Sequence, residues 1–309
     1  MKAVGFWQPG ESTSVIEDLS LPHPSMPKGR DLLIRVRAVA VNPRDLKSRR
    51  NISPSAGNPV VMGYDASGVV EATGPDVTLF RPGDHVFYAG VLDRQGANAE
   101  FQLVDERITG IKPAALSFEA AASVPLTGLT DWEMLFDRLQ LSVNGDADQT
   151  LLMLGGAGGV PCMAIQLART LSRVNIIGTA SRQESVRAVR GFGAHYVLDH
   201  SCALAPQVAS LAGLPPITRI FSTYTTPSAW ENMAEIIAPQ GRIGLIDDPE
   251  PLDLRLIKFK SVSVHWEAMF TRPMHVLRTC LNSMIFLTNS HACWIPVSSN
   301  LRCWQSMAG

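Results

Sequence analysis

The chain has 309 residues, with 27 lysines and arginines against 28 aspartates and glutamates, and 46% of its residues are hydrophobic. Its length favours two domains, and its near-neutral charge without basic blocks argues against a nucleic-acid partner, because phosphate binding needs clustered lysine and arginine. No apolar run reaches the roughly 20 residues of a membrane helix, and the N-terminus lacks a signal-peptide pattern, so we expect no membrane association and a cytoplasmic protein.

Short β-branched runs separated by glycine and proline fill the N-terminal part of the chain. They begin at Asp31, Gly68, Gly83 and Ala99. Glycine and proline at this frequency indicate many turns between short strands, which predicts a mostly β, barrel-like domain over residues 1–124. The densest basic cluster of the chain, within residues 44–50, is interpreted as a solvated loop.

From Pro125 the pattern changes, and apolar strand candidates alternate with helix-length segments. Helical spacing appears in residues 163–171, 184–192 and 228–237, the last with Ser228 as a candidate N-cap. This alternation predicts an α/β fold with a doubly wound parallel sheet over residues 125–266. The strand candidates begin at Thr150, Val174, Ala194, Thr218, Gly241 and Ser261.

A glycine-rich turn joins the first of these strands to a helix. A dinucleotide site needs glycines here because the backbone must turn tightly and aim its amides at a pyrophosphate. The alternative is a merely structural turn. Pro161 takes the place of a third glycine, which proline can do in a first helical turn, and it predicts weakened binding. The candidate cofactor-binding residues are Gly155, Gly156, Ala157, Gly158, Gly159 and Val160.

The second strand candidate ends without the acidic residue that favours NAD and continues into Ser181 and Arg182. A hydroxyl followed by a guanidinium suits the 2′-phosphate of NADPH. Alternatively, Ser181 caps the next helix and Arg182 is solvated. His200, after the next strand, is a further candidate contact or an ordinary surface histidine.

These segments and several others together resemble the zinc-independent, quinone-oxidoreductase-like branch of the medium-chain dehydrogenase/reductase superfamily. The resemblance implies a GroES-like catalytic domain followed by a Rossmann domain that binds NADPH. It rests on VNPRDLK from Val41, GYDASGVVEATG from Gly63, RPGDHVFYAG from Arg81, NAEFQLVDE from Asn98, ASVPLTGLTDWEMLFDRL from Ala122, TASRQES from Thr179 and HWEAMFTRPM from His265.

The resemblance also implies which residues form the site. Zinc-using relatives place a cysteine near the position of Asn42 and Gly-His-Glu where this chain has Gly63-Tyr64-Asp65, so we expect no zinc and no metal ligands. Asn42 and Thr127 would face the nicotinamide ribose or carboxamide, and Tyr224 would border the ring. Lys47 and Tyr64 are candidates for acceptor binding or proton supply. Alternatively, Tyr64 is a packed core ring and Lys47 a surface charge.

The implied function is hydride transfer from NADPH to a quinone, enone or related small carbonyl compound. The alternatives are a zinc-dependent alcohol dehydrogenase and a catalytically silent dinucleotide-binding or decayed protein. A homodimer through the strand at residues 261–266 is also expected.

Beyond residue 274 the chain departs from the family pattern, so residues 267–309 are interpreted as a truncated or divergent return segment. This segment carries three of the five cysteines of the chain. Because the number is odd and no CxxC pair occurs, we expect reduced thiols. The five are Cys162, Cys202, Cys280, Cys293 and Cys303.

Overall fold

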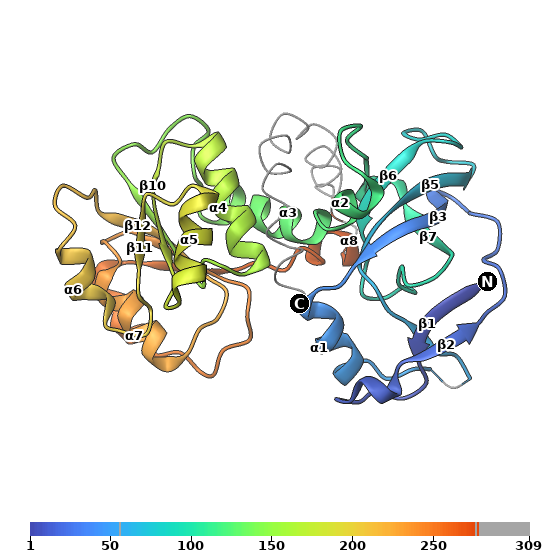
Figure 1. The fold of residues 1–309 in the computed structure, drawn as a ribbon, viewed down its shortest axis with the longest axis horizontal. Coiled ribbons are helices and arrows are strands. Elements are labelled where there is room, and N and C mark those ends of the chain that lie inside the picture. Colours follow the sequence, from blue (N-terminus) through green and yellow to red (C-terminus); the bar gives the residue numbers. More distant parts are fainter. Residues whose placement is uncertain (56, 276, 278–309) are drawn as a thin grey trace. The chain divides into compact units, whose positions relative to one another are not determined.

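The computed structural model describes residues 1–55, 57–275 and 277, and in it the chain divides into two compact units (Figure 1). Unit 1 contains Met1–Leu129 and the described residues from Met269 onward, and unit 2 contains Thr130–Ala268. No helix in the described part of the chain is long and apolar enough to cross a membrane.

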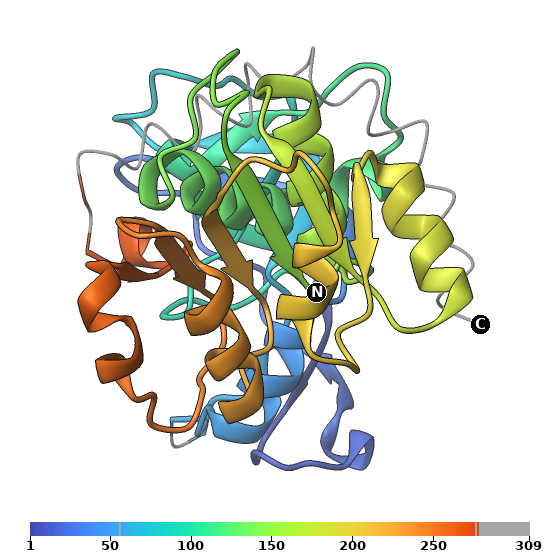
Figure 2. The same ribbon diagram turned by 90° about the vertical axis from the view of Figure 1, so that its left-hand side faces the viewer.

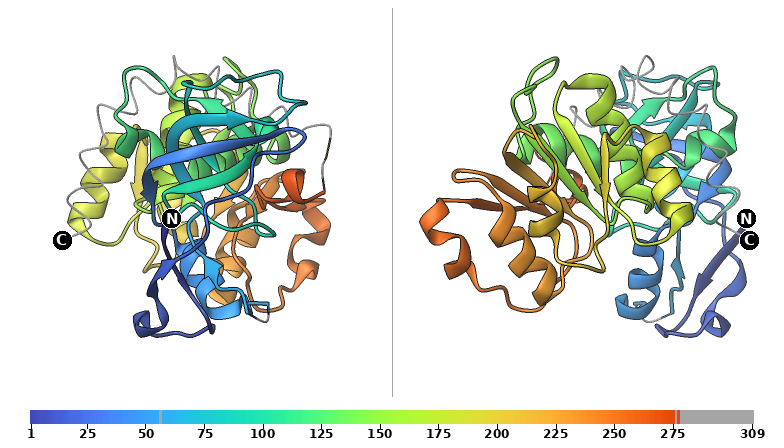
Figure 3. Two further views of the ribbon diagram at one scale, coloured as in Figure 1. Left: turned by 90° about the vertical axis from the view of Figure 1, so that its right-hand side faces the viewer. Right: turned by 60° about the vertical axis from the view of Figure 1, so that its left-hand side comes forward.

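Unit 1 is the mostly β unit, and the left panel of Figure 3 faces its strands. The long strand β3 (Asp31–Ala40) pairs antiparallel with β5 (Asp65–Thr73) on one side and β7 (Phe101–Asp105) on the other, and its alternate residues Leu32 and Ile34 are fully buried in the core. In the described residues the larger sheet has the order β7 (Phe101–Asp105), β3 (Asp31–Ala40), β5 (Asp65–Thr73), β6 (His85–Ala89), β8 (Thr109–Ile111), and the smaller sheet β2 (Glu17–Ser20), β1 (Lys2–Phe6), β4 (Val60–Val61). The helices are η1 (Thr13–Val15), α1 (Pro43–Asn51), η2 (Glu106–Ile108), α2 (Phe118–Ala122), α3 (Pro125–Trp132), whose last turn enters unit 2, and α8 (Thr271–Met274).

The basic cluster of residues 44–50 lies on helix α1, so its interpretation as a solvated loop is wrong. Arg49 is buried, and its guanidinium donates hydrogen bonds to the backbone carbonyls of Gly10 and Glu11. Residues that share one face of a helix are three or four positions apart, so the neighbours Arg49 and Arg50 lie on different faces. Arg49 is therefore buried while Arg50 is exposed.

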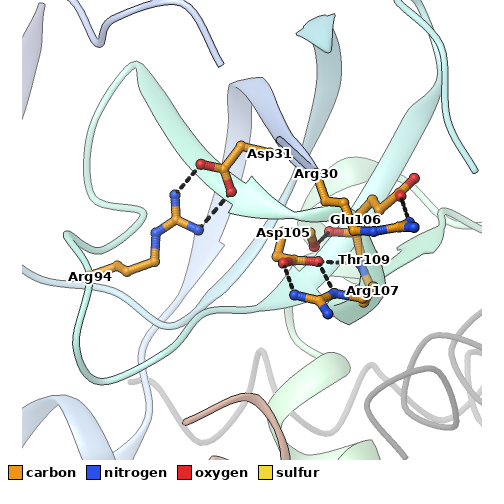
Figure 4. A network of polar contacts seen from close by, with 7 residues as sticks. All are labelled: Arg30, Asp31, Arg94, Asp105, Glu106, Arg107 and Thr109. Carbon is orange, nitrogen blue, oxygen red and sulfur yellow. Dashed lines mark hydrogen bonds and ion pairs between the residues drawn. The ribbon is translucent and has the colours of Figure 1, made fainter. Parts of the chain in front are cut away.

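A fully buried carboxylate, Glu106, ties a loop of unit 1 to the sheet (Figure 4). Its Oε1 lies 2.5 Å from Nη1 of Arg30, and its Oε2 accepts hydrogen bonds from the backbone amides of Thr78 and Leu79 at 2.9 and 2.8 Å. Both oxygens therefore have donors, as a buried charge requires. Figure 4 also shows two neighbouring bidentate pairs, Arg94 with Asp31 and Arg107 with Asp105.

Unit 2 is the predicted doubly wound parallel unit, and Figure 2 faces its sheet. Every predicted strand is present, and each begins within two residues of its predicted first residue. In the described residues the order is β11 (Tyr196–Leu198), β10 (Asn175–Thr179), β9 (Thr150–Leu154), β12 (Ile217–Ser222), β13 (Arg242–Leu245), β14 (Ser263–Trp266), all parallel. The helices are α4 (Gly159–Leu171), α5 (Gln183–Phe192), α6 (Leu204–Ala209), α7 (Pro227–Ile236) and η4 (Leu254–Lys260).

The two faces of this sheet bury different helices. Leu152, Ile177 and Ile220 belong to one apolar cluster with Trp230 and Met233 of α7. On the other face α4 packs beside α5, as right-handed crossovers require. Helix α7 is capped by Thr226, whose hydroxyl accepts from the amide of Ala229, and not by Ser228 as predicted.

Helix α3 continues into a π-helix, η3 (Glu133–Arg138), which the sequence did not predict. Two arginines on neighbouring strands contact its C-terminal carbonyls: Arg219 on β12 donates to Leu139, and Arg242 on β13 donates to Arg138 at 3.3 Å. The pair is well placed because a helix C-terminus carries partial negative charge. The unusual helix end is therefore held by the sheet beneath it.

The predicted divergent segment 267–309 lies largely outside the described residues. The same applies to the thiols predicted at Cys280, Cys293 and Cys303. Among the described residues, Cys162 and Cys202 take part in no disulfide bond.

Candidate active site

The carboxyl edge of the parallel sheet is where ligands bind in doubly wound folds, at the point where the strand order reverses. In unit 2 that point lies between β9 and β12, since β10 and β11 follow on one side and β13 and β14 on the other. The hydroxyl of Thr223, just after β12, donates to the carbonyl of Leu154 at the end of β9 at 3.3 Å. This bond ties the two strand ends together beside the glycine turn.

The first glycine of the turn, Gly155, has a φ of +76°, which disfavours any side chain. A Cβ atom at this position would lie 2.7 Å from Oγ1 of Thr223. Two bonds fix the turn: the amide of Gly155 donates to the hydroxyl of Thr179 at 3.0 Å, and the amide of Gly156 donates to the Thr179 carbonyl at 3.0 Å. Thr179, which the sequence reading did not single out as a site residue, therefore organises the turn from the end of β10.

Other amides of the turn remain available for a ligand. The amide of Gly158 donates to the Gly155 carbonyl, and the first helical bond of α4 runs from Cys162 to Gly158 at 3.0 Å. Within the described chain, no acceptor takes the amides of Ala157, Gly159 and Val160. Free amides at the start of a 13-residue helix form a site for an anion such as a pyrophosphate.

Pro161 does not interrupt helix α4, which runs continuously from Gly159 to Leu171. The proline is the third residue of the helix, where an amide would have no partner within the helix. Its ring is buried. Proline at position 161 lacks a backbone amide that could bind phosphate, but the amides of Ala157, Gly159 and Val160 remain.

The end of β10 presents the residues expected to select the nicotinamide. Ser181 and Arg182 are exposed, and neither side chain has a hydrogen-bond partner among the described residues. Arg182 is the N-cap residue of α5 by position, so Ser181 does not cap that helix. His200 follows β11, and its Nδ1 lies 3.2 Å from the Thr179 hydroxyl. The structure thus links His200 to the glycine turn through Thr179.

Beyond β12, Tyr224 is 74% exposed, and its neighbour Thr225 is buried and fixed. The hydroxyl of Thr225 lies 3.0 Å from Ser222 Oγ and 3.1 Å from the carboxylate of Asp247, which follows β13. A rigid backbone therefore carries an exposed aromatic ring at the carboxyl edge of the sheet.

In unit 1, Asn42 and Asp65 form the centre of a buried polar network. The side-chain amide of Asn42 donates to Oδ2 of Asp65 at 2.8 Å, and the amide of Leu126 donates to Oδ1 at 2.7 Å. Burial raises the pKa of Asp65 to about 8, against the opposite effect of these two hydrogen bonds, and the nearby Asp45 carboxylate raises it further. Asp45 in turn accepts from the backbone amide of Asn42 at 2.7 Å.

The other predicted residues of unit 1 have distinct settings. Tyr64 is buried; its hydroxyl lies 2.7 Å from Ser48 Oγ, and its ring packs edge-on against Phe270 at 5.3 Å. Lys47 is half-buried on α1. Thr127 is buried in α3, and its hydroxyl donates to the Val124 carbonyl at 3.1 Å. The structure therefore brings Asn42 to Asp65 and Tyr64 to Ser48, and the roles assigned to these residues stay predictions.

Comparison with known proteins identifies the family. Residues 28–125 match the family model for the alcohol dehydrogenase GroES-like domain, and residues 159–281 match the model for zinc-binding dehydrogenases. A zinc-type alcohol dehydrogenase-like protein of Staphylococcus aureus (strain COL) is 40% identical over 89% of this chain and 82% of its own length. The chain belongs to the quinone-oxidoreductase-like branch of the medium-chain dehydrogenase/reductase superfamily.

Further members of this superfamily support the assignment. A quinone oxidoreductase of Pseudomonas aeruginosa is 34% identical over 71% of this chain and 65% of its own length. A Rhizobium etli structure, provisionally named a zinc-dependent alcohol dehydrogenase, has a TM-score of 0.90 and 47% identity, covering 96% of this chain and 87% of that one. A mycobacterial structure complexed with NADPH has a TM-score of 0.79 and 28% identity, covering 97% and 89%. The GroES-like and Rossmann assignments and the oxidoreductase class are confirmed.

Proposed function

We propose that this protein is an NADPH-dependent oxidoreductase that reduces a quinone, an enone or a related small carbonyl compound without catalytic zinc. The observation that carries the proposal is the glycine turn, where the amides of Ala157, Gly159 and Val160 have no acceptor within the described chain. They would hold the pyrophosphate of a dinucleotide, and the partial positive charge of the α4 N-terminus adds to their attraction. When bound, the cofactor supplies the hydride.

Selection of NADPH over NADH is proposed for Ser181 and Arg182. Both are exposed after β10, where the ribose of a dinucleotide lies in this fold. An unpaired guanidinium can grip a 2′-phosphate through two parallel bonds, and His200 lies at the end of the neighbouring strand. The complex of the mycobacterial relative with NADPH supports this choice.

The residues of unit 1 are proposed for the acceptor and for the nicotinamide. Asn42 and Thr127 would contact the ribose or carboxamide, with Tyr224 of unit 2 beside the ring. Reduction adds a hydride to the acceptor and then a proton. Lys47 and the Tyr64 hydroxyl, paired with Ser48, are the proposed proton or hydrogen-bond donors.

Independence of zinc is proposed because the side chains at the ligand positions do not suit the metal. Asn42 offers an amide in place of a thiolate, and Tyr64 stands where an imidazole is needed. Both oxygens of Asp65 already accept hydrogen bonds. Within the described residues no group of three or more His, Cys, Asp or Glu side chains is arranged to hold a metal ion.

A homodimer through β14 is proposed because this strand ends the parallel sheet of unit 2. An edge strand offers unpaired backbone groups, and a second copy could pair with them. Beside it, Phe259 is 94% exposed and Trp266 is 55% exposed. Sedimentation analysis would test the proposal, with Phe259→Ser expected to shift the protein toward the monomer.

The decisive experiment for function is a titration with NADPH and NADH, followed by nicotinamide fluorescence, on the wild type and on Arg182→Ala. We expect the variant to lose about tenfold in NADPH affinity, because one charge-assisted contact is removed, and to keep its NADH affinity. Arg187→Ala, an exposed arginine of the same helix, is the matched control.

An acceptor assay with and without a chelator then separates the alternatives. Turnover that survives the chelator supports the zinc-independent reductase. Turnover lost with the metal would indicate a zinc-dependent alcohol dehydrogenase. Cofactor binding without turnover of any acceptor would indicate a silent dinucleotide-binding protein.

A further inference from the structure

Arg44 is a half-buried arginine of unit 1 whose donors have no acceptor within the described chain. It is the second residue of α1, and its Cζ lies 5.9 Å from the centre of the Phe270 ring. Its Nε is buried and has no hydrogen-bond partner in the described part of the chain. A contact with an aromatic ring uses the positive charge of the guanidinium and none of its hydrogen-bond donors.

The fold gains little from a cation at this position. The N-terminus of a helix carries partial positive charge, which disfavours an arginine in the first turn. Arg49, one and a half turns further along the same helix, shows the contrasting structural use: it is buried, and it donates to the carbonyls of Gly10 and Glu11. Arg44 donates to no carbonyl within the described residues, so its donors are open to a ligand.

The carboxylate of the neighbouring residue Asp45 has another hydrogen-bond partner. Oδ2 of Asp45 accepts the backbone amide of Asn42 at 2.7 Å, which commits this side chain to the start of the helix. Burial, the largest influence, raises the pKa of Asp45, against the opposite effect of its backbone hydrogen bonds and of the Arg44 charge. The two side chains thus interact through their charges, but within the described residues no acceptor takes a hydrogen bond from the Arg44 guanidinium.

The surroundings of Arg44 suit an unsaturated organic anion. The ring of Phe270 contacts both the Arg44 guanidinium, at 5.9 Å, and the ring of Tyr64, which packs edge-on against it at 5.3 Å. Asn42, proposed to face the nicotinamide, precedes Arg44 by two residues. A planar conjugated acceptor would meet aromatic surface and a positive charge in one place.

We propose that Arg44 binds an anionic group of the acceptor, so that the preferred substrates are enones or quinones that carry a carboxylate or a similar acidic substituent. This inference rests on the proposed reductase function. With an enone acid, the hydride of NADPH adds to the β-carbon and a proton adds to the α-carbon, which yields the saturated oxo acid and NADP⁺. The carboxylate is unchanged and serves only for recognition.

The test compares trans-4-oxopent-2-enoate with its methyl ester, which share one enone and differ in charge. For the wild type we expect kcat/KM to favour the acid. Arg44→Met should reduce this preference by about tenfold, the effect of losing one charge-assisted contact, and leave the rate with the ester nearly unchanged. Arg50→Met, an exposed arginine of the same helix, controls for the change in net charge. Equal preference for acid over ester in the wild type and in Arg44→Met would overturn the inference.

Two binding measurements separate this inference from the proposed function. Binding of 4-oxopentanoate, the saturated product, followed by ligand NMR, needs no turnover and should be lost in Arg44→Met and kept in Arg50→Met. If neither acceptor is reduced but only Arg44→Met loses binding of 4-oxopentanoate, the proposed reductase function is wrong and the anion site is supported. If Arg44→Met binds 4-oxopentanoate as the wild type does, the anion site is wrong.

The second measurement is the affinity for NADPH, which should be the same in all three proteins. A loss of NADPH affinity in Arg44→Met would assign this arginine to the cofactor and overturn the inference.

Discussion

The side-chain amide of Asn42 donates a 2.8 Å hydrogen bond to the carboxyl group of Asp65, which is completely buried. The amide of Leu126 donates to the other oxygen of Asp65. Three segments of unit 1 that are distant in sequence therefore meet at one acid. Because burial raises the pKa of that acid to about 8, the network should respond to pH near neutrality.

The first prediction concerns the pH dependence of stability. A folded pKa of about 8 against the ordinary value of 3.8 means that the Asp65 contribution is fully present below pH 3.8 and is lost as the pH rises through 8. The slope would approach about 1.4 kcal/mol per pH unit. Asp65→Asn cannot titrate, so the difference in unfolding free energy between the two proteins should shift with pH in urea denaturation from pH 5 to 8. If the unfolding free energies of the wild type and Asp65→Asn changed with pH in parallel, Asp65 would have the same charge in the folded and unfolded states.

A second acid, Asp131 in α3, is completely buried, and neither of its oxygens has a hydrogen-bond partner among the residues that the structure describes. Burial raises its pKa well above the usual value. Asp131→Ala should stabilise the protein by about 1–2 kcal/mol at pH 7, because it removes an unsatisfied polar group from a helix that favours alanine. The gain should grow with pH, since ionisation of the wild-type side chain is penalised only in the folded state. Thermal unfolding at pH 6 and 8 would check both points, and a destabilised variant would contradict the prediction.

The glycine turn yields a third prediction. Gly155→Ala places a Cβ at a φ of +76°, 2.7 Å from the Thr223 hydroxyl, so we expect a loss of about 1–2 kcal/mol in stability and weaker NADPH binding. Gly191→Ala is the matched control, because this residue lies in α5 and a Cβ added there would meet no other atom within 4 Å. Alanine there should be neutral or slightly stabilising. Equal cofactor affinity in both variants would argue against a role of the turn in binding.

The fourth prediction concerns the buried carboxylate of Figure 4. Glu106→Ala should destabilise the protein by about 2–4 kcal/mol, because the amides of Thr78 and Leu79 lose their acceptor. Glu71→Ala breaks only the exposed pair with Arg35 and should cost less than about 1 kcal/mol. Urea denaturation measures both, and similar losses would show that burial does not distinguish the two carboxylates.

The sequence by itself determined the six strands of the parallel sheet, three of the helices beside them and the glycine turn, but not the short strands β1, β2, β4 and β8 or helix α6. These features are encoded locally: alternation of apolar residues marks a strand, helical spacing marks a helix, and a backbone turn with a positive φ requires glycine at a position such as Gly155. For the same reason the strand Thr150–Leu154 was predicted at its observed bounds. A basic run such as residues 44–50 has no clear apolar period, so its helix was missed.

Tertiary structure alone decided which polar groups meet. Arg49 was read as solvated and is buried against Gly10 and Glu11, Asp65 joins Asn42 to Leu126, and Arg44 lies over Phe270. The reason is physical: a polar side chain can find its partner anywhere along the chain, and its charge state depends on burial by segments far away in sequence. The composition of a local window therefore does not reveal whether such a group is paired, neutralised or left available for a ligand.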